Sequence, residues 1–181
     1  MSEQAKALIT EIFDAACVKQ FESLGCQIEV TDRSSYSREV MASYITAGSE
    51  DLTISLLLKT PRLLLAQTMP IVDVDRIGDP SFQEDWNCEL ANRFLGRIKN
   101  SLVQHNCRLA IGLPEVMSKS DMKHFHCDGE EIVRHFSISS EITDSVMDCH
   151  LYVDLHNDAL YLTEGRRPVE GQGNEGDLVI L

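Results

Sequence analysis

The sequence predicts an α+β fold in which two long helices pack on a largely antiparallel sheet. Apolar residues recur at helical spacing along residues 5–24 and again along residues 82–104. Between and after these stretches lie short apolar runs bounded by turn residues, which is typical of strands. The 181 residues are 43% hydrophobic, enough for one core. We therefore expect one domain over residues 1–163 and a Gly-rich, flexible tail over residues 164–181.

The first half is expected to begin with a helix from Ala5 to Leu24, because Gly25 directly after it suits a helix cap. A short helix is expected from Thr60-Pro61 to about Met69, followed by a polar link from Pro70 to Pro80. The strands expected between these helices are Cys26–Val30, Val40–Ala47 and Leu52–Leu58, the last two joined by a hairpin.

The second long helix is expected over residues 82–104, where an apolar residue recurs at every fourth position. The residues of this stripe are Phe82, Trp86, Leu90, Phe94, Ile98 and Leu102. The strands expected after it are Arg108–Val116, Ile132–Ser139, Ser145–Leu155 and a last pairing segment, Ala159–Thr163. A helix followed by three strands thus occurs twice, as a pseudo-repeat of topology.

The face of this helix opposite the apolar stripe carries an unusual set of residues. Glu89, Asn92 and Gly96 fall on it, at a spacing that makes them neighbours, and Asp85 precedes them by one turn. Asn is a poor helix former and Gly costs about 1 kcal/mol against Ala. A missing side chain beside polar ones makes sense if another protein approaches this turn closely. The alternative is an ordinary solvated face with an accidental Gly.

Charge and cysteine pattern restrict the function classes. With 16 basic and 29 acidic residues the formal charge is −13, so the surface that neutralises phosphates in nucleic-acid binding is missing. No apolar run is long enough to span a bilayer, and no basic-then-apolar leader opens the chain. The six cysteines form no CxxC pair and are expected to be reduced. We expect a cytoplasmic protein with no nucleic-acid partner and no membrane insertion.

The usual catalytic and ligand motifs are weak or missing. His124, His126 and Cys127 cluster in KHFHCDGEE, but a structural zinc site wants four ligands and no fourth has a telling spacing. The chain has no GxSxG, GxGxxG or GxxxxGK[ST] motif. The acidic residues from Asp73 to Asp85 lack the EF-hand register and suit the start of a helix instead. We therefore expect no metal site.

The segment Glu89-Leu-Ala-Asn92 with Gly96, followed by RLAIGLPEV at 108–116, resembles the CheX-type phosphatases of the CheC/CheX/FliY chemotaxis group. The resemblance covers roughly residues 5–160 and includes a later strand, GEEIVRHF, at 129–136. Glu84 and Asn87 match the same two-residue pattern, but Asn87 points toward the apolar stripe. CheC-type members carry a second motif on the first helix. Here that helix offers Asp14 in place of Asn, so one site is expected per chain, as in CheX.

The resemblance implies a CheC/CheX-like fold and hydrolysis of the phospho-aspartate of a CheY-like response regulator. Asn92 would orient the attacking water and Glu89 would accept from the regulator's lysine, while Asp85, Arg93 and Gly96 would contact the partner. The alternative role of Arg93 is an intrahelical pair with Glu89. Mg²⁺ would come from the regulator, and the protein would need no cofactor of its own. The family tends to pair through its sheet, and the late apolar strands, Val146–Leu155 and Ala159–Leu162, would otherwise leave an exposed edge, so a homodimer is expected.

Two rival interpretations remain open at this point. In the first, the same helix docks a receiver domain as a non-catalytic adaptor of a two-component or chemotaxis pathway. In the second, the histidine cluster makes the chain a metal-binding regulatory protein. Neither the regulator served nor the pathway follows from the sequence.

Overall fold

The computed structural model describes residues 1–34, 39–70, 77–139 and 144–156 and confirms the α+β fold class. The helices are α1 (Glu3–Glu22), α2 (Arg62–Thr68), α3 (Pro80–Val103) and α4 (Lys119–His124). The strands are β1 (Gln27–Thr31), β2 (Val40–Gly48), β3 (Leu52–Pro61), β4 (Ala110–Ile111), β5 (Glu115–Met117), β6 (Glu130–Ser139) and β7 (Asp144–Leu155). At most ends of the helices and strands, these bounds differ from the expected ones by a few residues.

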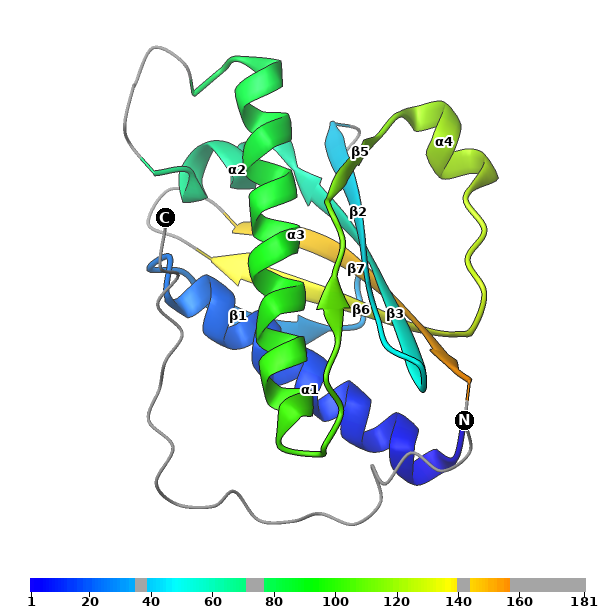
Figure 1. Ribbon diagram of the computed structural model, residues 1–181. Helices are drawn as coiled ribbons and strands as arrows, with labels where there is room; N and C mark the ends of the chain where they lie inside the picture. The colour runs from blue at the N-terminus through cyan, green and yellow to red at the C-terminus, as the bar shows by residue number, and fades with distance from the viewer. Residues whose placement is uncertain (35–38, 71–76, 140–143, 157–181) are drawn as a thin grey trace, which may run out of the picture.

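All seven strands form one antiparallel sheet in the order β1-β6-β7-β3-β2-β4, with β5 also pairing with β2. The long helices α1 and α3 lie on the same face of the sheet (Figure 1). Apolar side chains alternate along the central strands, so Ile54, Leu56 and Leu58 of β3 all point into the core beneath the helices. Between α1 and the sheet, Phe13 stacks on Phe94 of α3 at 5.3 Å between ring centroids. The core therefore fixes α3 against both the sheet and α1.

The expected strand Arg108–Val116 is instead two short strands, β4 and β5, and this expectation was wrong in its extent. The Gly112 N–H still donates to Thr46 O of β2 at 2.8 Å. Leu113 is then 88% exposed, and Pro114 has no N–H to offer a neighbouring strand. The pairing is therefore interrupted between Gly112 and Glu115. The second half still follows its long helix with strands, with the unexpected helix α4 inserted among them.

The late strands do not leave an exposed edge, contrary to the expectation that supported a homodimer. Strand β7 lies in the middle of the sheet, paired with β6 on one side and with β3 on the other. One end of the sheet is β1, which carries Val30 at 49% exposure, and the other is formed by β4 and β5 beside β2. The strand expected at Ala159–Thr163 and the tail from residue 164 lie outside the described residues, so both remain predictions.

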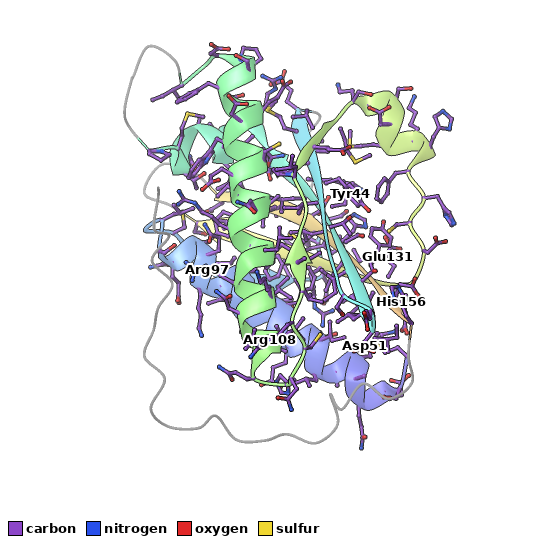
Figure 2. The ribbon with its side chains drawn as sticks, in the orientation of Figure 1. Tyr44, Asp51, Arg97, Arg108, Glu131 and His156 are labelled. Atoms are coloured by element: carbon purple, nitrogen blue, oxygen red, sulfur yellow. The ribbon has the colours of Figure 1, made fainter. Side chains whose placement is uncertain are left out.

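The face of the sheet away from α1 and α3 is partly covered by the segment that follows α4. Phe125 contacts Tyr44 of β2 and Tyr152 of β7 edge-on, at 5.0 and 5.5 Å between ring centroids. Figure 2 labels Tyr44 and Glu131 on the side of the strands where this segment passes. Beside Tyr152, the Glu131 carboxylate accepts from the Tyr152 hydroxyl at 2.8 Å and lies 2.8 Å from His150 Nδ1. Polar side chains on this face are thus tied into a network.

This network makes stability depend on pH near neutrality. Burial, together with the nearby Lys59 ammonium, lowers the pKa of His150, although Glu131 and Asp148 oppose the shift. An unfolded His titrates near about 6.5. Because the folded protein disfavours protonation here, the unfolded chain binds more protons as the pH falls through 6.5. We expect the melting temperature to fall as the pH is lowered from about 7 to about 5.5. In His150→Gln the melting temperature should fall less over the same range.

The control for this melting series is His126→Gln, because His126 is an exposed imidazole outside the strands. Its slope should equal that of wild type. An unchanged slope in His150→Gln would contradict the assignment.

All six cysteines are free thiols, as the sequence predicts. Cys17 and Cys149 are buried. Burial is the main cause that raises the pKa of the Cys17 thiol, and the neighbouring Cys149 raises it further. No helix of the described chain is long and apolar enough to cross a membrane.

Candidate functional site

The candidate site lies on α3, whose start is well defined by the sequence. The Asp79 carboxylate caps the helix by accepting from the Ser81 N–H at 3.0 Å, and Pro80 occupies the first turn. The apolar stripe is confirmed. Its buried members are Trp86, Leu90, Ala91, Phe94, Leu95, Ile98 and Leu102.

Glu89, Asn92 and Gly96 lie away from this stripe, but they are less exposed than a free helix face would be. The Glu89 side chain is 39% exposed, and Asn92 and Gly96 are half-buried. The expectation of an open, solvated face was therefore too strong. The reason is that α3 contacts α1, α2, β2, β3 and β5, which leave only a narrow strip of the helix accessible.

Gly96 has no packing reason to be a glycine. A Cβ built on its backbone meets nothing within 4 Å outside the helix itself. Ala would therefore fit the folded chain and would favour the helix by about 1 kcal/mol. Within the described chain, the glycine is a cost that no internal contact explains.

Asn92 presents a carboxamide with unused hydrogen-bonding capacity. It lies one turn after Glu89 and one turn before Gly96, so the three residues form a row along the accessible strip of α3. Among the described residues, none donates to or accepts from the Asn92 side chain. Its amide can both donate and accept, and both functions are available to a partner.

Glu89 is held in place by its own helix. The Arg93 Nε lies 2.6 Å from Glu89 Oε1, an i,i+4 ion pair with both side chains about 40% exposed. The Arg93 guanidinium also lies over the Trp86 ring, 5.3 Å from its centroid. Of the two roles considered for Arg93, the structure contains the intrahelical pair. The support that Trp86 lends to this pair was not predictable from its spacing, because the residue also belongs to the apolar stripe.

The residues beside the row do not provide a nucleophile. Asp85 is exposed one turn before Glu89. Burial, and then the nearby Asp85 and Glu84 carboxylates, raise the pKa of the Cys88 thiol. Cys88 therefore stays protonated near neutral pH and is a poor nucleophile. The arrangement can position groups on a partner, but it does not suggest a covalent intermediate on this chain.

Arg97, next to Gly96, points away from the row. Its Nε donates to Gln20 Oε1 of α1 at 2.9 Å, which ties α3 to the C-terminal end of α1. Figure 2 shows Arg97 on the side of α3 where that end of α1 lies. The Arg97 side chain is therefore kept off the accessible strip.

The two further matches to the motif are used by the fold. Asn87 is 1% exposed, as expected for a residue pointing toward the stripe, and its backbone carbonyl accepts from the Ser43 hydroxyl at 3.2 Å. On α1, both Asp14 carboxylate oxygens accept from Arg134 Nε of β6, at 3.0 and 3.3 Å. Asp14 thus holds α1 to the sheet, and α1 presents no second free motif.

The histidine cluster is not arranged as a metal site. His124 ends helix α4, so His124 and His126 do not lie on one face of a single extended segment. Between them, Phe125 packs against two tyrosines on the sheet. The part of the chain that the structure describes contains no group of three or more His, Cys, Asp or Glu side chains placed to hold a metal ion.

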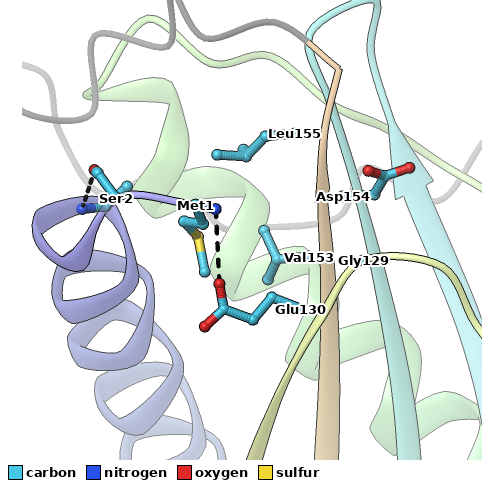
Figure 3. A pocket seen from close by; sticks show the side chains of 8 residues that line it. Met1, Ser2, Gly129, Glu130, Val153, Asp154 and Leu155 are labelled. Carbon is cyan, nitrogen blue, oxygen red and sulfur yellow. Dashed lines mark hydrogen bonds and ion pairs between the residues drawn. The ribbon is translucent and has the colours of Figure 1, made fainter.

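A cavity of about 320 Å³ lies between the start of α1 and the ends of β6 and β7 (Figure 3). The Met1 ammonium lies 3.8 Å from Glu130 Oε2 at its wall. Gly129 is required there, because its φ is +100° and an added Cβ would meet Val153 O at 2.5 Å. This cavity is lined by residues of α1, β6 and β7, and none of the predicted site residues contributes to it.

The comparisons agree with the fold. No protein-family model matches the chain, and no curated protein matches it in sequence. Chemotaxis protein CheX from Vibrio vulnificus is similar in structure, with a TM-score of 0.62 at 14% identity over 81% of this chain and 99% of that one. CheX in the CheX-CheY-BeF3-Mg²⁺ complex from Borrelia burgdorferi gives 0.55 at 12% identity, over 81% and 96%.

The middle domain of FliM from H. pylori is a further structural neighbour. Its TM-score is 0.56 at 8% identity, over 84% of this chain and 94% of that one. The same fold thus occurs in proteins with different names and assemblies, so the fold alone does not select an activity. The chain has the α+β fold shared by the CheX and CheC-like chemotaxis proteins.

Proposed function

We propose that the protein is a phosphatase that hydrolyses the phospho-aspartate of a CheY-like response regulator. The observation that carries the proposal is the row of Glu89, Asn92 and Gly96 on the accessible strip of α3. Gly96 has no internal reason to be glycine, and Asn92 has an unused carboxamide. The proposal is also supported by the fold, since one neighbour was solved as a CheX-CheY-BeF3-Mg²⁺ complex.

In this mechanism the protein supplies positioning. The Asn92 carboxamide enters the receiver site, accepts from the attacking water and donates toward a phosphoryl oxygen. Water attacks phosphorus, the bond from phosphorus to the aspartyl oxygen breaks, and the aspartate leaves as a carboxylate with release of inorganic phosphate. Phosphoryl transfer depends chiefly on positioning and charge stabilisation, so one helix face can suffice without a deep pocket.

Glu89 docks the helix by accepting from a lysine of the receiver, a charge-assisted hydrogen bond. In the free protein this carboxylate is already oriented by Arg93, which in turn rests on Trp86. The incoming lysine therefore meets a carboxylate that points out of the helix. Gly96 leaves the backbone bare one turn beyond Asn92, so the receiver surface can approach it.

Mg²⁺ is proposed to be supplied by the receiver, and the protein itself to need no cofactor. We expect chelation with EDTA to stop dephosphorylation of the receiver without changing the melting temperature of the isolated protein. The measurement is a thermal melt of the protein alone beside a phosphate-release assay with the receiver. A large loss of melting temperature in EDTA would support the metal-binding interpretation instead.

The protein is further proposed to be a cytoplasmic homodimer. One end of the sheet is β1. Within the described residues one side of this strand is unpaired, and Val30 on it is exposed. Such edges favour pairing with another chain. Light scattering at micromolar concentration should give about twice the 20.3 kDa of one chain. A species of chain mass alone across that range would contradict the dimer.

The competing candidate is a receiver-binding adaptor without turnover. It is favoured by the FliM middle domain, which has the same fold. The two functions are separated by one assay, in which the decay of a phosphorylated receiver domain is followed with and without the protein. Acceleration supports the phosphatase, whereas binding to the receiver without acceleration supports the adaptor.

A further inference from the structure

A small apolar pocket opens directly beside the row on α3. Its volume is about 250 Å³, and Glu89 belongs both to the row and to the pocket wall. Its lining residues are Met69, Pro70, Phe82, Asp85, Trp86 and Glu89. The pocket therefore continues the surface that the proposed function assigns to the receiver.

The floor and the rim of this pocket differ in chemistry. The floor is built from apolar side chains, and the Trp86 indole N–H is not available there because it donates to Thr68 Oγ1 at 3.1 Å. The two carboxylates, Asp85 and Glu89, lie one turn apart on the helix at the rim. A group that enters the pocket would thus bury apolar surface, and the residues next to that group would face the two carboxylates.

The size of the pocket suits a side chain better than a cofactor. Small-molecule sites commonly measure about 300–1,000 Å³, and this pocket is smaller. No polar group lines its floor to fix the orientation of a polar ligand. Protein interfaces, in contrast, often place one apolar anchor in a pocket of this kind, with polar contacts around it.

We propose that this pocket receives an apolar side chain of the receiver domain, one that stands next to the cationic group bound by Glu89. This inference rests on the proposed function, since it names a second contact at the same surface. The carboxylate rim selects a receiver surface with a basic group beside the apolar anchor, which complements the formal charge of −13 on this chain. The pocket thereby contributes affinity and choice of receiver, and Asn92 contributes turnover.

The test separates binding from turnover with a receiver domain carrying beryllofluoride and Mg²⁺ as the probe. Phe82→Ala removes one wall of the pocket and should raise the Kd about tenfold, an effect typical of a lost anchor contact. The single-turnover rate of dephosphorylation at saturating protein should stay within twofold of wild type. Val133→Ala, which trims an exposed apolar residue on β6, is the matched control and should leave the Kd unchanged.

Asp85→Lys guards against a folding defect in Phe82→Ala, because Asp85 is exposed and its replacement leaves the core intact. It should also raise the Kd, and less so at high salt. Wild type that accelerates dephosphorylation, with a Kd moved by neither substitution, overturns the pocket assignment alone. Wild type that binds without acceleration, with a Kd moved by both, supports the pocket and overturns the phosphatase. Wild type that binds no receiver overturns both proposals.

Discussion

Asn92→Ala is expected to lower the rate of receiver dephosphorylation by about 100-fold or more at saturating protein. This corresponds to about 2.7 kcal/mol of transition-state stabilisation, as expected for the loss of one positioning group. The fold should be unaffected, because the Asn92 side chain makes no hydrogen bond to the described residues and Ala is the better helix former. The decay of a phosphorylated receiver and a thermal melt provide the two measurements.

Two further variants make this result specific. Asn100→Ala makes the same chemical change at an exposed position later in α3 and should keep full activity. Glu89→Ala should weaken both docking and turnover, because the bond to the receiver lysine is lost. In contrast, Asn92→Ala should bind the beryllofluoride complex nearly as well as wild type. Full phosphatase activity in Asn92→Ala would end the proposed mechanism.

Local sequence signals were enough for the layers of the fold. The stripe from Phe82 to Leu102 predicts α3, and the apolar run Leu52–Leu58 predicts β3, which is buried on both faces. The pairing partners were not predictable in this way, because they depend on contacts distant in sequence. Strand β7 was taken for an edge, although its partners β3 and β6 enclose it. The capping box of α4, formed by Ser118 and Asp121, was present in the sequence and was overlooked.

For the site, spacing along one helix predicted which residues form the row, because Glu89, Asn92 and Gly96 lie on a single regular element. The contacts between this helix and other elements could not be predicted from spacing along one helix. The pocket beside Glu89 joins α3 to Met69 and Pro70 at the end of α2, and the sequence does not specify how these elements meet. Asp14 showed its structural role only through Arg134, 120 residues later.

Gly96→Leu is expected to stabilise the protein and to weaken its binding to the receiver. The Cβ position at Gly96 is open, so a side chain can start there without meeting a neighbour, and leucine replaces the poorest ordinary helix former with a good one. The free energy of unfolding should rise by about 0.8 kcal/mol. If the receiver approaches this turn closely, the added bulk should raise the Kd for the beryllofluoride receiver complex by at least about 100-fold, which corresponds to about 2.7 kcal/mol.

The matched control for this variant is Asn100→Leu, which adds the same side chain one turn after Gly96 on α3, beyond the end of the row. Asn100→Leu should leave the Kd unchanged. The smaller substitution Gly96→Ala should keep the Kd within about threefold of wild type. Denaturant unfolding gives the stability, and titration of the receiver complex gives the Kd. A glycine without function at this position would give a more stable protein with unaltered docking in Gly96→Leu. That result would remove the reason for placing the receiver on this face, because no other property of the helix requires a glycine at its accessible strip.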